Sequence, residues 1–259
     1  MKIGAIVESR MTSSRLPGKI MLPIMGKPAL SLLVERLRQC SDIHEIVIAT
    51  TVNHCDEVLI DIGKQLGVRS FRGSEYDVME RVFLAAKEYA IDIIVEITSD
   101  CPLVDPDLIS RSIQILKEGG YDYVSNIIKR TFPRGLDVQT FKTTVLREIH
   151  HTTTDPVDRE HVALHIYEHP EKYKLHNFTA PAGMEMEEQR LTLDTPEDYF
   201  VIRAVFQALY ASDKPFNYSK IYSFLKDNPH IASINRHIEQ KKARPYDFTA
   251  KARQYLGIE

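Results

Sequence analysis

The stretch Lys2-Ile-Gly-Ala-Ile-Val7, continued by Glu8-Ser-Arg-Met-Thr-Ser-Ser-Arg-Leu-Pro-Gly-Lys19, decides the fold of this chain. Its first six residues are mostly apolar and predict a buried strand, and apolar residues at helical spacing between Pro28 and Gln39 predict a helix. The basic segment between them is therefore a long loop that joins a strand to a helix. That order is typical of the units that build parallel sheets.

Strand-like and helix-like segments continue to alternate through the first half of the chain. Further strands are predicted at 45–51, 68–71 and 91–97, and further helices at 58–66, 75–89 and 107–117. This alternation predicts an α/β fold with a mostly parallel central sheet flanked by helices. Ligands of open sheets lie beyond the carboxyl ends of the strands, so we expect the segments after Val7, Thr51 and Ile97 to carry function.

The second half of the chain is less regular. Its predicted strands span 121–126, 136–141, 174–180 and 190–193. A helix is expected from Pro156 to Tyr167, capped by Asp155, and another begins at Pro196. The polar tail 237–259 is predicted to be a C-terminal appendage on the core.

Bulk composition excludes several classes of protein. With 43% hydrophobic and 27% charged residues, and no apolar run near the roughly 20 residues that span a bilayer, the chain is not expected to cross a membrane. The apolar start is too short for a signal peptide, which predicts a cytoplasmic protein. Three cysteines without paired spacing indicate neither a disulfide framework nor a cysteine zinc site. A net charge of -3 argues against general nucleic-acid binding.

The loop after the first strand concentrates positive charge. Arg10 and Arg15 suit the fork geometry of phosphate binding, Lys19 supplies a point charge, and backbone N–H groups and hydroxyls can surround phosphate oxygens. The loop is not a Walker A motif, because Gly18-Lys19 is followed by Ile20 and no glycine stands five positions earlier. Composition alone leaves two alternatives open, a polyphosphate cradle or a solvated surface loop with incidental charges.

The same loop carries a family resemblance. Ser9-Arg-Met-Thr-Ser-Ser-Arg-Leu-Pro-Gly-Lys19, followed by Leu22-Pro-Ile-Met-Gly-Lys-Pro28, is similar to the opening signature of cytidylyltransferases that activate acidic sugars. The likeness is greatest to the branch called spore coat polysaccharide biosynthesis protein F, and it covers roughly residues 1–210. This chain departs from the branch where Glu8-Ser9 replace the usual Gln-Ala and where Thr12 replaces the usual Gly.

The resemblance implies a single Rossmann-like nucleotidyltransferase domain, of the glycosyltransferase-A-like type, over residues 1–259. Within it, residues 120–190 are expected to bind the acceptor and to form a dimer, and residues 237–259 form the C-terminal appendage. The implied activity is transfer of CMP from CTP to a sugar, an acidic one, with release of pyrophosphate. It would serve surface polysaccharide or glycan biosynthesis in the cytoplasm, as a homodimer, without nucleic-acid or membrane partners.

The resemblance also assigns roles to residues. The catalytic residues that it implies are Arg10, Arg15, Lys19 and Asp100. The residues expected to contact the nucleotide are Ser9, Ser13, Ser14, Gly73, Ser74 and Asp77. The residues expected to bind the acceptor are Arg134, Asp137, Arg159, Glu160 and His161. An acidic sugar calls for a bidentate cation, which Arg134 or Arg159 can supply. From the residues alone, Ser74 and Asp77 are equally well explained as helix-start residues, with Ser74 as the N-cap.

Two aspartates are candidate ligands of Mg²⁺. Asp100 follows the most β-branched strand, and Asp194 follows the predicted strand 190–193, before the helix that Pro196 opens. Magnesium prefers a few carboxylates together with water and substrate phosphates, so carboxylates at strand ends suit it. Each aspartate also has a simpler explanation, a turn before Pro102 for Asp100 and a helix cap for Asp194. Resemblance to the metal aspartates of the family favours Mg²⁺.

Two further patterns point to metals less strongly. Asp105 and Asp107 form the D-x-D pattern of many glycosyltransferases, but the helix that follows favours a capping role. His161, His165 and His169 have the spacing of one helix face, yet no H-E-x-x-H motif is present. Acceptor-facing or surface histidines are therefore favoured over a zinc site.

Three alternative functions stay open at this point. Guanylyl or uridylyl transfer to a sugar 1-phosphate would use the same loop, and a glycosyltransferase would consume a nucleotide-sugar without releasing pyrophosphate. A non-catalytic nucleotide-binding protein would keep the fold alone. Both aspartates and all three loop cations are present in this sequence, which favours an enzyme.

Overall fold

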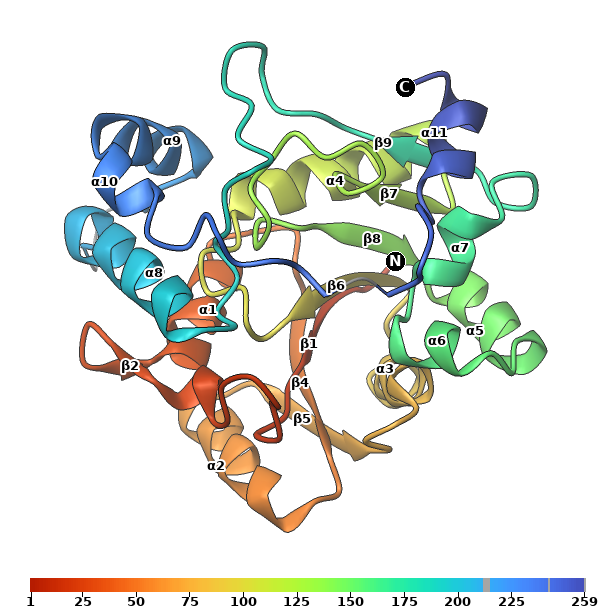
Figure 1. Cartoon of the computed structure of the whole chain (residues 1–259). Coiled ribbons are helices and arrows are strands. Elements are labelled where there is room, and N and C mark those ends of the chain that lie inside the picture. The colour runs from red at the N-terminus through yellow and green to blue at the C-terminus, as the bar shows by residue number, and fades with distance from the viewer. Residues whose placement is uncertain (212–214, 242, 259) are drawn as a thin grey trace.

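A seven-stranded sheet forms the centre of the computed structural model, which describes residues 1–211, 215–241 and 243–258 (Figure 1). In spatial order the strands are β5 (Arg69–Gly73), β4 (Glu45–Thr51), β1 (Ile3–Glu8), β6 (Ile93–Thr98), β8 (Gln139–Lys142), β7 (Tyr123–Ser125) and β9 (Leu175–Asn177). The first four are parallel, and β8 runs antiparallel to both of its neighbours. A small hairpin of β2 (Pro23–Ile24) and β3 (Lys27–Pro28) stands apart. The predicted α/β fold with a mostly parallel central sheet is confirmed.

Helices cover both faces of the sheet (Figure 1). One hydrophobic core includes residues of α1 (Ala29–Leu37), α2 (Glu57–Leu66), α4 (Pro106–Gly119), α8 (Pro196–Leu209) and α9 (Tyr218–Asp227). The other includes residues of α3 (Val78–Glu88), α5 (Thr143–Thr152), α7 (Leu164–Glu168) and α11 (Ala250–Leu256). The shorter helices are α6 (Pro156–Glu160), α10 (Pro229–Ala232) and the 3-10 helices η1 (Lys19–Met21) and η2 (His54–Asp56).

Local sequence explains most of these elements. β1 and β6 are buried along nearly their whole length, because both faces of a central parallel strand pack against helices, and their sequences are correspondingly apolar. α2 and α4 end where Gly67 and Gly120 adopt the left-handed conformation, with φ of 63° and 61°. Asp105 caps α4 by accepting hydrogen bonds from the backbone N–H groups of Asp107 and Leu108. The predicted capping role of this D-x-D segment is therefore confirmed.

The predicted helix 156–167 is wrong. It is divided into α6 and α7 by a break at His161. Asp158 accounts for the break, because Oδ2 of its carboxylate lies 2.8 Å from Nδ1 of His165 and Oδ1 lies 2.8 Å from the guanidinium of Arg244. These tertiary contacts override the helical spacing of the apolar residues. His161 and His165 therefore do not share one helix face.

The predicted strand 190–193 is also wrong. Among these described residues Arg190 makes an isolated β-bridge to Arg134, and the others are irregular. Gly135 permits the approach, because it has a φ of 100° and a Cβ on it would lie 2.4 Å from the backbone of Leu191. The segment around Arg134 and the segment before α8 are therefore held together at backbone distance.

Other boundaries differ from the prediction. α3 begins at Val78 instead of Glu75, and its N-cap is Asp77, which accepts a hydrogen bond from the N–H of Glu80. Ser74, the predicted N-cap, precedes the helix. The sequence-based prediction misses α5 and α9, although each has three buried apolar side chains at helical spacing, Val145, Leu146 and Ile149 in α5 and Tyr218, Ile221 and Leu225 in α9.

The tail crosses the molecule instead of extending from it. After α10 it runs from the side of α8 and α9 to α11, which packs beside α7 (Figure 1). Asn235 is fully buried on this path and donates a hydrogen bond to Asp198. The predicted appendage 237–259 thus packs against the core, apart from residues 242 and 259, which lie outside the described residues. Within the described parts of the chain, no helix has the length and apolar character that crossing a membrane requires.

Candidate active site

Three charged groups meet beyond the carboxyl ends of the strands. The ammonium of Lys19, in η1, lies 2.7 Å from Oδ2 of Asp100 and 2.7 Å from Oδ1 of Asp194. Asp100 stands just after β6, and Asp194 stands just before α8. Arg15 Nη2 lies 2.8 Å from the same oxygen of Asp194. The structure therefore brings two predicted cations and both predicted metal aspartates into one group, called here the loop cluster.

Asp194 is the most deeply buried member of the loop cluster. Its side chain is 2% exposed, and Nη2 of Arg190 lies 3.4 Å from its second oxygen. Thr195, and not Asp194, caps α8, and it forms a capping box with Asp198. Because the helix does not need Asp194 as its cap, the carboxylate is left to bind cations.

Charge pairing sets the protonation states in the loop cluster. Burial by itself would raise the pKa of Asp100, but the positive charge and hydrogen bond of Lys19 outweigh it, so this pKa lies below its ordinary value. Burial would likewise lower the pKa of Lys19, and the negative charges of Asp100 and Asp194 reverse that effect and raise it. At neutral pH Asp100 is therefore ionised and Lys19 is charged.

The two carboxylates fit a divalent cation that also binds phosphate. Lys19 already holds a positive charge between Asp100 and Asp194, so this position attracts cations. The described residues contain no group of three or more His, Cys, Asp or Glu side chains suited to hold a metal by themselves. Magnesium is compatible with such a site, because it uses few carboxylates and completes its shell with water and substrate phosphates.

The basic loop is ordered by an acid from the segment after β5. Glu75 accepts a hydrogen bond from the hydroxyl of Thr12 at 2.7 Å and lies 3.9 Å from Nη1 of Arg10. The side chains of Arg10 and Arg15 nevertheless stay 43% and 40% exposed. Both guanidinium groups are thus within reach of a ligand in solution.

The three predicted loop serines have different surroundings. Ser14 is exposed, and the partly exposed Ser13 accepts a hydrogen bond from the N–H of Leu16 at 3.5 Å. Ser9 is buried, and its hydroxyl donates to the carbonyl of Val7. Ser13 and Ser14 can therefore meet a ligand with little rearrangement, whereas Ser9 is engaged with its own strand.

The predicted nucleoside segment lies at the end of β5. Gly73 ends the strand, and the hydroxyl of Ser74 accepts a hydrogen bond from the N–H of Asp77. A Cβ on Gly73 would lie 3.1 Å from the side chain of Arg81, which donates to the carbonyl of Ser74. Asp77 caps α3, and its other oxygen lies 3.2 Å from Arg159. The Ser74 hydroxyl and the Asp77 carboxylate are thus both engaged in the turn that starts α3, and Asp77 also pairs with Arg159.

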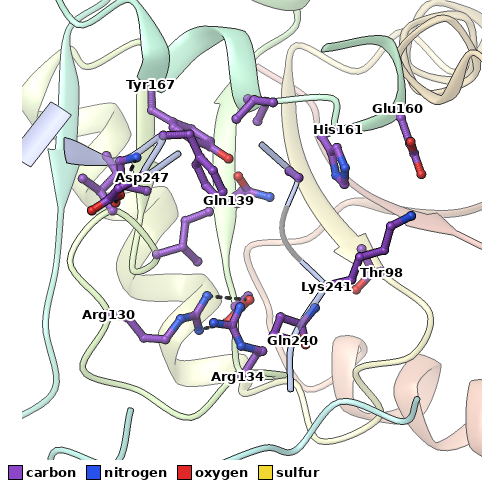
Figure 2. A pocket seen from close by; sticks show the side chains of 18 of the residues that line it. Thr98, Arg130, Arg134, Gln139, Glu160, His161, Tyr167, Gln240, Lys241 and Asp247 are labelled. Carbon is purple, nitrogen blue, oxygen red and sulfur yellow. Dashed lines mark hydrogen bonds and ion pairs between the residues drawn. The ribbon is translucent and has the colours of Figure 1, made fainter. Parts of the chain in front are cut away.

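A cavity of about 1140 Å³ adjoins the loop. Its walls come from β1, β6, β8, the segment before β8, the α6–α7 region and the tail (Figure 2). Its volume is ample for a sugar-sized ligand. Four of the predicted acceptor residues line it, namely Arg134, Asp137, Glu160 and His161. Burial lowers the pKa of His161, so its imidazole is neutral at neutral pH.

Arg159, the fifth predicted acceptor residue, is not part of the described cavity wall. Its guanidinium donates to the carbonyl oxygens of Thr153 and His150 and pairs with Asp77. These partners belong to the layer of α3 and α5, so Arg159 ties helices together. Of the two arginines considered for an acidic acceptor, the structure brings Arg134 into the cavity.

Two arginines lie at one end of the cavity (Figure 2). Arg130 is paired with Asp137. Arg134 makes no side-chain hydrogen bond or ion pair with any residue that the structure describes. Burial lowers the pKa of Arg134, and the neighbouring charge of Arg130 lowers it further. A half-buried guanidinium without a partner is suited to bind an anion such as a carboxylate.

The tail forms a wall of the cavity that the sequence does not predict. Gln240, Lys241 and Asp247 line the cavity (Figure 2). Gln240 accepts a hydrogen bond from Arg190 at 2.6 Å, and Arg244 pairs with acidic side chains of the α6–α7 region. The tail has no apolar periodicity that would signal this packing, and Arg244 is one charge among several in its sequence.

Comparisons with known proteins agree with this architecture. A family model described as cytidylyltransferase matches residues 4–249. The spore coat polysaccharide biosynthesis protein SpsF of Bacillus subtilis is 33% identical, over 88% of this chain and 95% of its own length. The 3-deoxy-manno-octulosonate cytidylyltransferase of Geobacter metallireducens is 26% identical, over 79% of this chain and 89% of its own. The solved structure of a cytidylyltransferase from Leptospira borgpetersenii serovar Hardjo-bovis matches with a TM-score of 0.85 and 32% identity, over 93% of this chain and 100% of that one.

Proposed function

Because this chain belongs to the cytidylyltransferase family, we propose that it transfers CMP from CTP to an acidic sugar and releases pyrophosphate. The observation that carries the proposal is the position of Lys19, 2.7 Å from both Asp100 and Asp194 at the carboxyl edge of the sheet. Nucleotidyl transfer needs cationic groups for the leaving pyrophosphate and a separate space for the acceptor. The loop cluster and the cavity offer these two features next to each other.

The residues of the loop bind the triphosphate in this proposal. Arg10 and Arg15 hold phosphate oxygens in the fork geometry, and Lys19 stabilises the negative charge that develops on the departing pyrophosphate. The hydroxyls of Ser13 and Ser14 add hydrogen bonds to the same oxygens. Ser9, Gly73, Ser74 and Asp77 are assigned to the nucleotide side by resemblance.

Magnesium is the proposed cofactor, with Asp100 and Asp194 as its protein ligands. When bound, it would offset negative charge on the reacting phosphate oxygens. Arg15 and Arg190 hold the carboxylate of Asp194 in place from two sides. The low pKa of Asp100, caused by Lys19 against the effect of burial, keeps that ligand ionised.

The acceptor occupies the cavity in this proposal. Arg134 binds the carboxylate of the sugar, and Asp137, Glu160 and His161 bind its hydroxyl groups. The names of the relatives from Bacillus and Geobacter support a role in surface polysaccharide or glycan biosynthesis. We further propose that the protein is cytoplasmic and homodimeric, with residues 120–190 contributing to both the acceptor site and the dimer contact.

A pyrophosphate-release screen tests the proposal. It crosses the four nucleoside triphosphates with keto-sugar acids and sugar 1-phosphates, with and without Mg²⁺. We expect turnover with CTP and a keto-sugar acid only when Mg²⁺ is present. Turnover of GTP or UTP with a sugar 1-phosphate would instead establish the alternative transferase, and nucleotide binding without turnover on any acceptor would establish a non-catalytic protein.

A further inference from the structure

Two glutamates on neighbouring strands meet on one wall of the cavity. Glu8 ends β1 and Glu96 lies in β6, and the parallel register aligns Glu8 with Thr98 and Ile6 with Glu96. Side chains two residues apart in a strand share a face, so both glutamates lie on the same face of the sheet. Their carboxyl groups interact there, and each shifts the pKa of the other. Both residues line the cavity.

This carboxyl pair is short of hydrogen-bond donors. Glu96 is 7% exposed, and its Oε2 is buried without a hydrogen bond from any described residue. Oε1 of Glu8 is also buried without a partner among those residues. Buried polar atoms are nearly always hydrogen-bonded, so two such oxygens on a cavity wall indicate a place for an incoming donor. A sugar hydroxyl is a donor of this kind.

Glu8 lies at the boundary between the cavity and the basic loop. It directly precedes the basic loop, and its register partner Thr98 stands just before Asp100. No residue of the described segment 9–19 lines the cavity, so the cavity and the loop adjoin at Glu8 and Thr98. With an acceptor in the cavity and a phosphate on the loop, as proposed above, Glu8 would lie at the boundary between the two.

The charges around the pair favour one shared proton. Burial raises the pKa of Glu8 from 4.5 to about 7, while Arg81 and the hydrogen bond from Glu96 oppose the rise, and Asp100 and Arg10 have smaller effects of opposite sign. Burial, and then the charge of Glu8, raise the pKa of Glu96 well above its ordinary value. The buried phenols of Tyr123 and Tyr167 also interact with Glu96, and Asp137, His161 and Lys241 line the same cavity. Near neutral pH Glu96 therefore keeps its proton, while Glu8 is passing from its neutral carboxyl form to the carboxylate.

We propose that, in the transfer reaction proposed above, Glu8 accepts the proton of the attacking acceptor hydroxyl while Glu96 positions it by donating a hydrogen bond. The acceptor O–H bond breaks as its oxygen bonds to the α-phosphorus of CTP. The bond from that phosphorus to the bridging oxygen breaks, and its electron pair leaves with pyrophosphate. The proton moves to Oε1 of Glu8 and passes to solvent after the products leave, which restores the carboxylate.

Glu8→Gln tests the proton transfer, because it keeps the size of the side chain and removes the base. We expect kcat to fall about 100-fold or more, while KM for CTP changes less than about threefold. The base has to be ionised, so the pH–rate profile of the wild type should have an acid limb, in which kcat rises with pH around pH 7. This acid limb should be absent in Glu8→Gln. Glu118→Gln, at an exposed position of α4, is the matched control.

Glu96→Gln tests the positioning role. Its amide still donates a hydrogen bond to Glu8, so most activity should be retained. An amide is a weaker donor than a carboxyl group and stabilises the Glu8 carboxylate less, so the acid limb should move to higher pH. A purely structural Glu96 would change the melting temperature of the variant without moving the limb.

The ¹³C carboxyl titration of the glutamates gives a readout that does not depend on turnover. One resonance should titrate near pH 7 in the wild type and be missing in Glu8→Gln. The role of Glu8 is overturned if Glu8→Gln keeps the wild-type kcat and acid limb, or if no glutamate titrates near pH 7. In either case, pyrophosphate release by the wild type leaves the proposed function standing. Absence of wild-type pyrophosphate release with every substrate pair overturns the proposed function and the role of Glu8 together.

Discussion

The loop cluster and the adjoining cavity differ in whether their charged and polar groups have partners. In the loop cluster Lys19 lies between Asp100 and Asp194, so oppositely charged groups already satisfy one another. In the cavity Arg134 has no such partner among the described residues, and Glu8 leaves a buried oxygen without a hydrogen bond. A ligand of the loop has to compete with ion pairs inside the protein, and only a highly charged ligand competes effectively. A ligand of the cavity instead satisfies groups that the fold leaves open.

The largest expected effect concerns the aspartates of the loop cluster. Asp100→Asn and Asp194→Asn each remove a negative charge at nearly constant volume, and pyrophosphate release should fall at least about 1,000-fold in either variant. The double variant should lose little more, because two ligands of one cation act as a unit. Release over a magnesium titration measures both effects. Losses that multiply independently, or near-normal turnover in one variant, would show that the two aspartates share no cation.

The same two variants should differ in stability. Asp194→Asn removes one of the two carboxylates that pair with Lys19 and one of the two that pair with Arg190. It should lower the free energy of unfolding by about 2 kcal/mol, while Asp100 and Asp198 keep both cations paired. The side chain of Asp100 is more exposed, so Asp100→Asn should cost less. Denaturant titration without nucleotide measures the difference. Equal free energies of unfolding for the two variants would mean that the deeper burial of Asp194 does not make its charge more important for stability.

The next effect concerns the unpaired cation of the cavity. Arg134→Ala should raise KM for an acidic acceptor roughly 30-fold, the loss of about 2 kcal/mol of charge-assisted hydrogen bonding, with little change in KM for CTP. Arg159→Ala should instead lower the melting temperature and leave KM for the acceptor within about twofold. Steady-state kinetics with thermal melts separates the two results. The reverse pattern would place the acceptor against Arg159.

A smaller effect is expected for an exposed cation of the loop. Arg15→Ala should weaken CTP binding about tenfold, because one charge-assisted contact is lost, and should change the melting temperature little, since its side chain is 40% exposed. Lys64→Ala, at an exposed ion pair on α2, serves as the control. Calorimetric titration with CTP measures the affinity. An unchanged affinity in Arg15→Ala would remove this residue from the phosphate site.

The smallest effect concerns stability and pH. The pKa of Glu8 rises in the folded protein to about 7, because its burial disfavours the carboxylate, so folding is opposed increasingly as pH rises from about 4.5 through 7. The melting temperature of Glu8→Gln should therefore be close to that of the wild type at pH 5 and exceed it by a few degrees at pH 8. A gap that is equal at both pH values would mean that Glu8 does not titrate in this range.

The sequence locates the basic loop and the strand end before Asp100 far better than it locates the walls of the cavity. The basic loop is one continuous segment, 9–19, after an apolar strand, so charge and periodicity are enough to locate it, and the same holds for the strand end before Asp100. The contacts of Lys19 are different, because they join residues 81 and 175 positions apart in the chain. A local pattern contains no information about such pairs.

The cavity is assembled from segments that no local pattern connects. The Glu8–Glu96 pair results from strand register, and the wall made by the tail depends on the ion pairs of Arg244. The errors at 156–167 and 190–193 have the same cause, since tertiary contacts override local preference at both places. Resemblance suggests candidate acceptor residues by type, and the three-dimensional structure shows that Arg134 lines the cavity and that Arg159 does not.

The tail that walls the cavity is synthesised after the loop cluster. Chains emerge from the ribosome from the N-terminus, so the sheet, the basic loop and both aspartates are made before the tail residues that line the cavity, such as Gln240, Lys241 and Asp247. Contacts between such distant segments also form slowly during folding. The loop cluster can therefore assemble before the cavity wall is complete, and under the proposed assignment of the cavity an acceptor can bind only after the tail has packed.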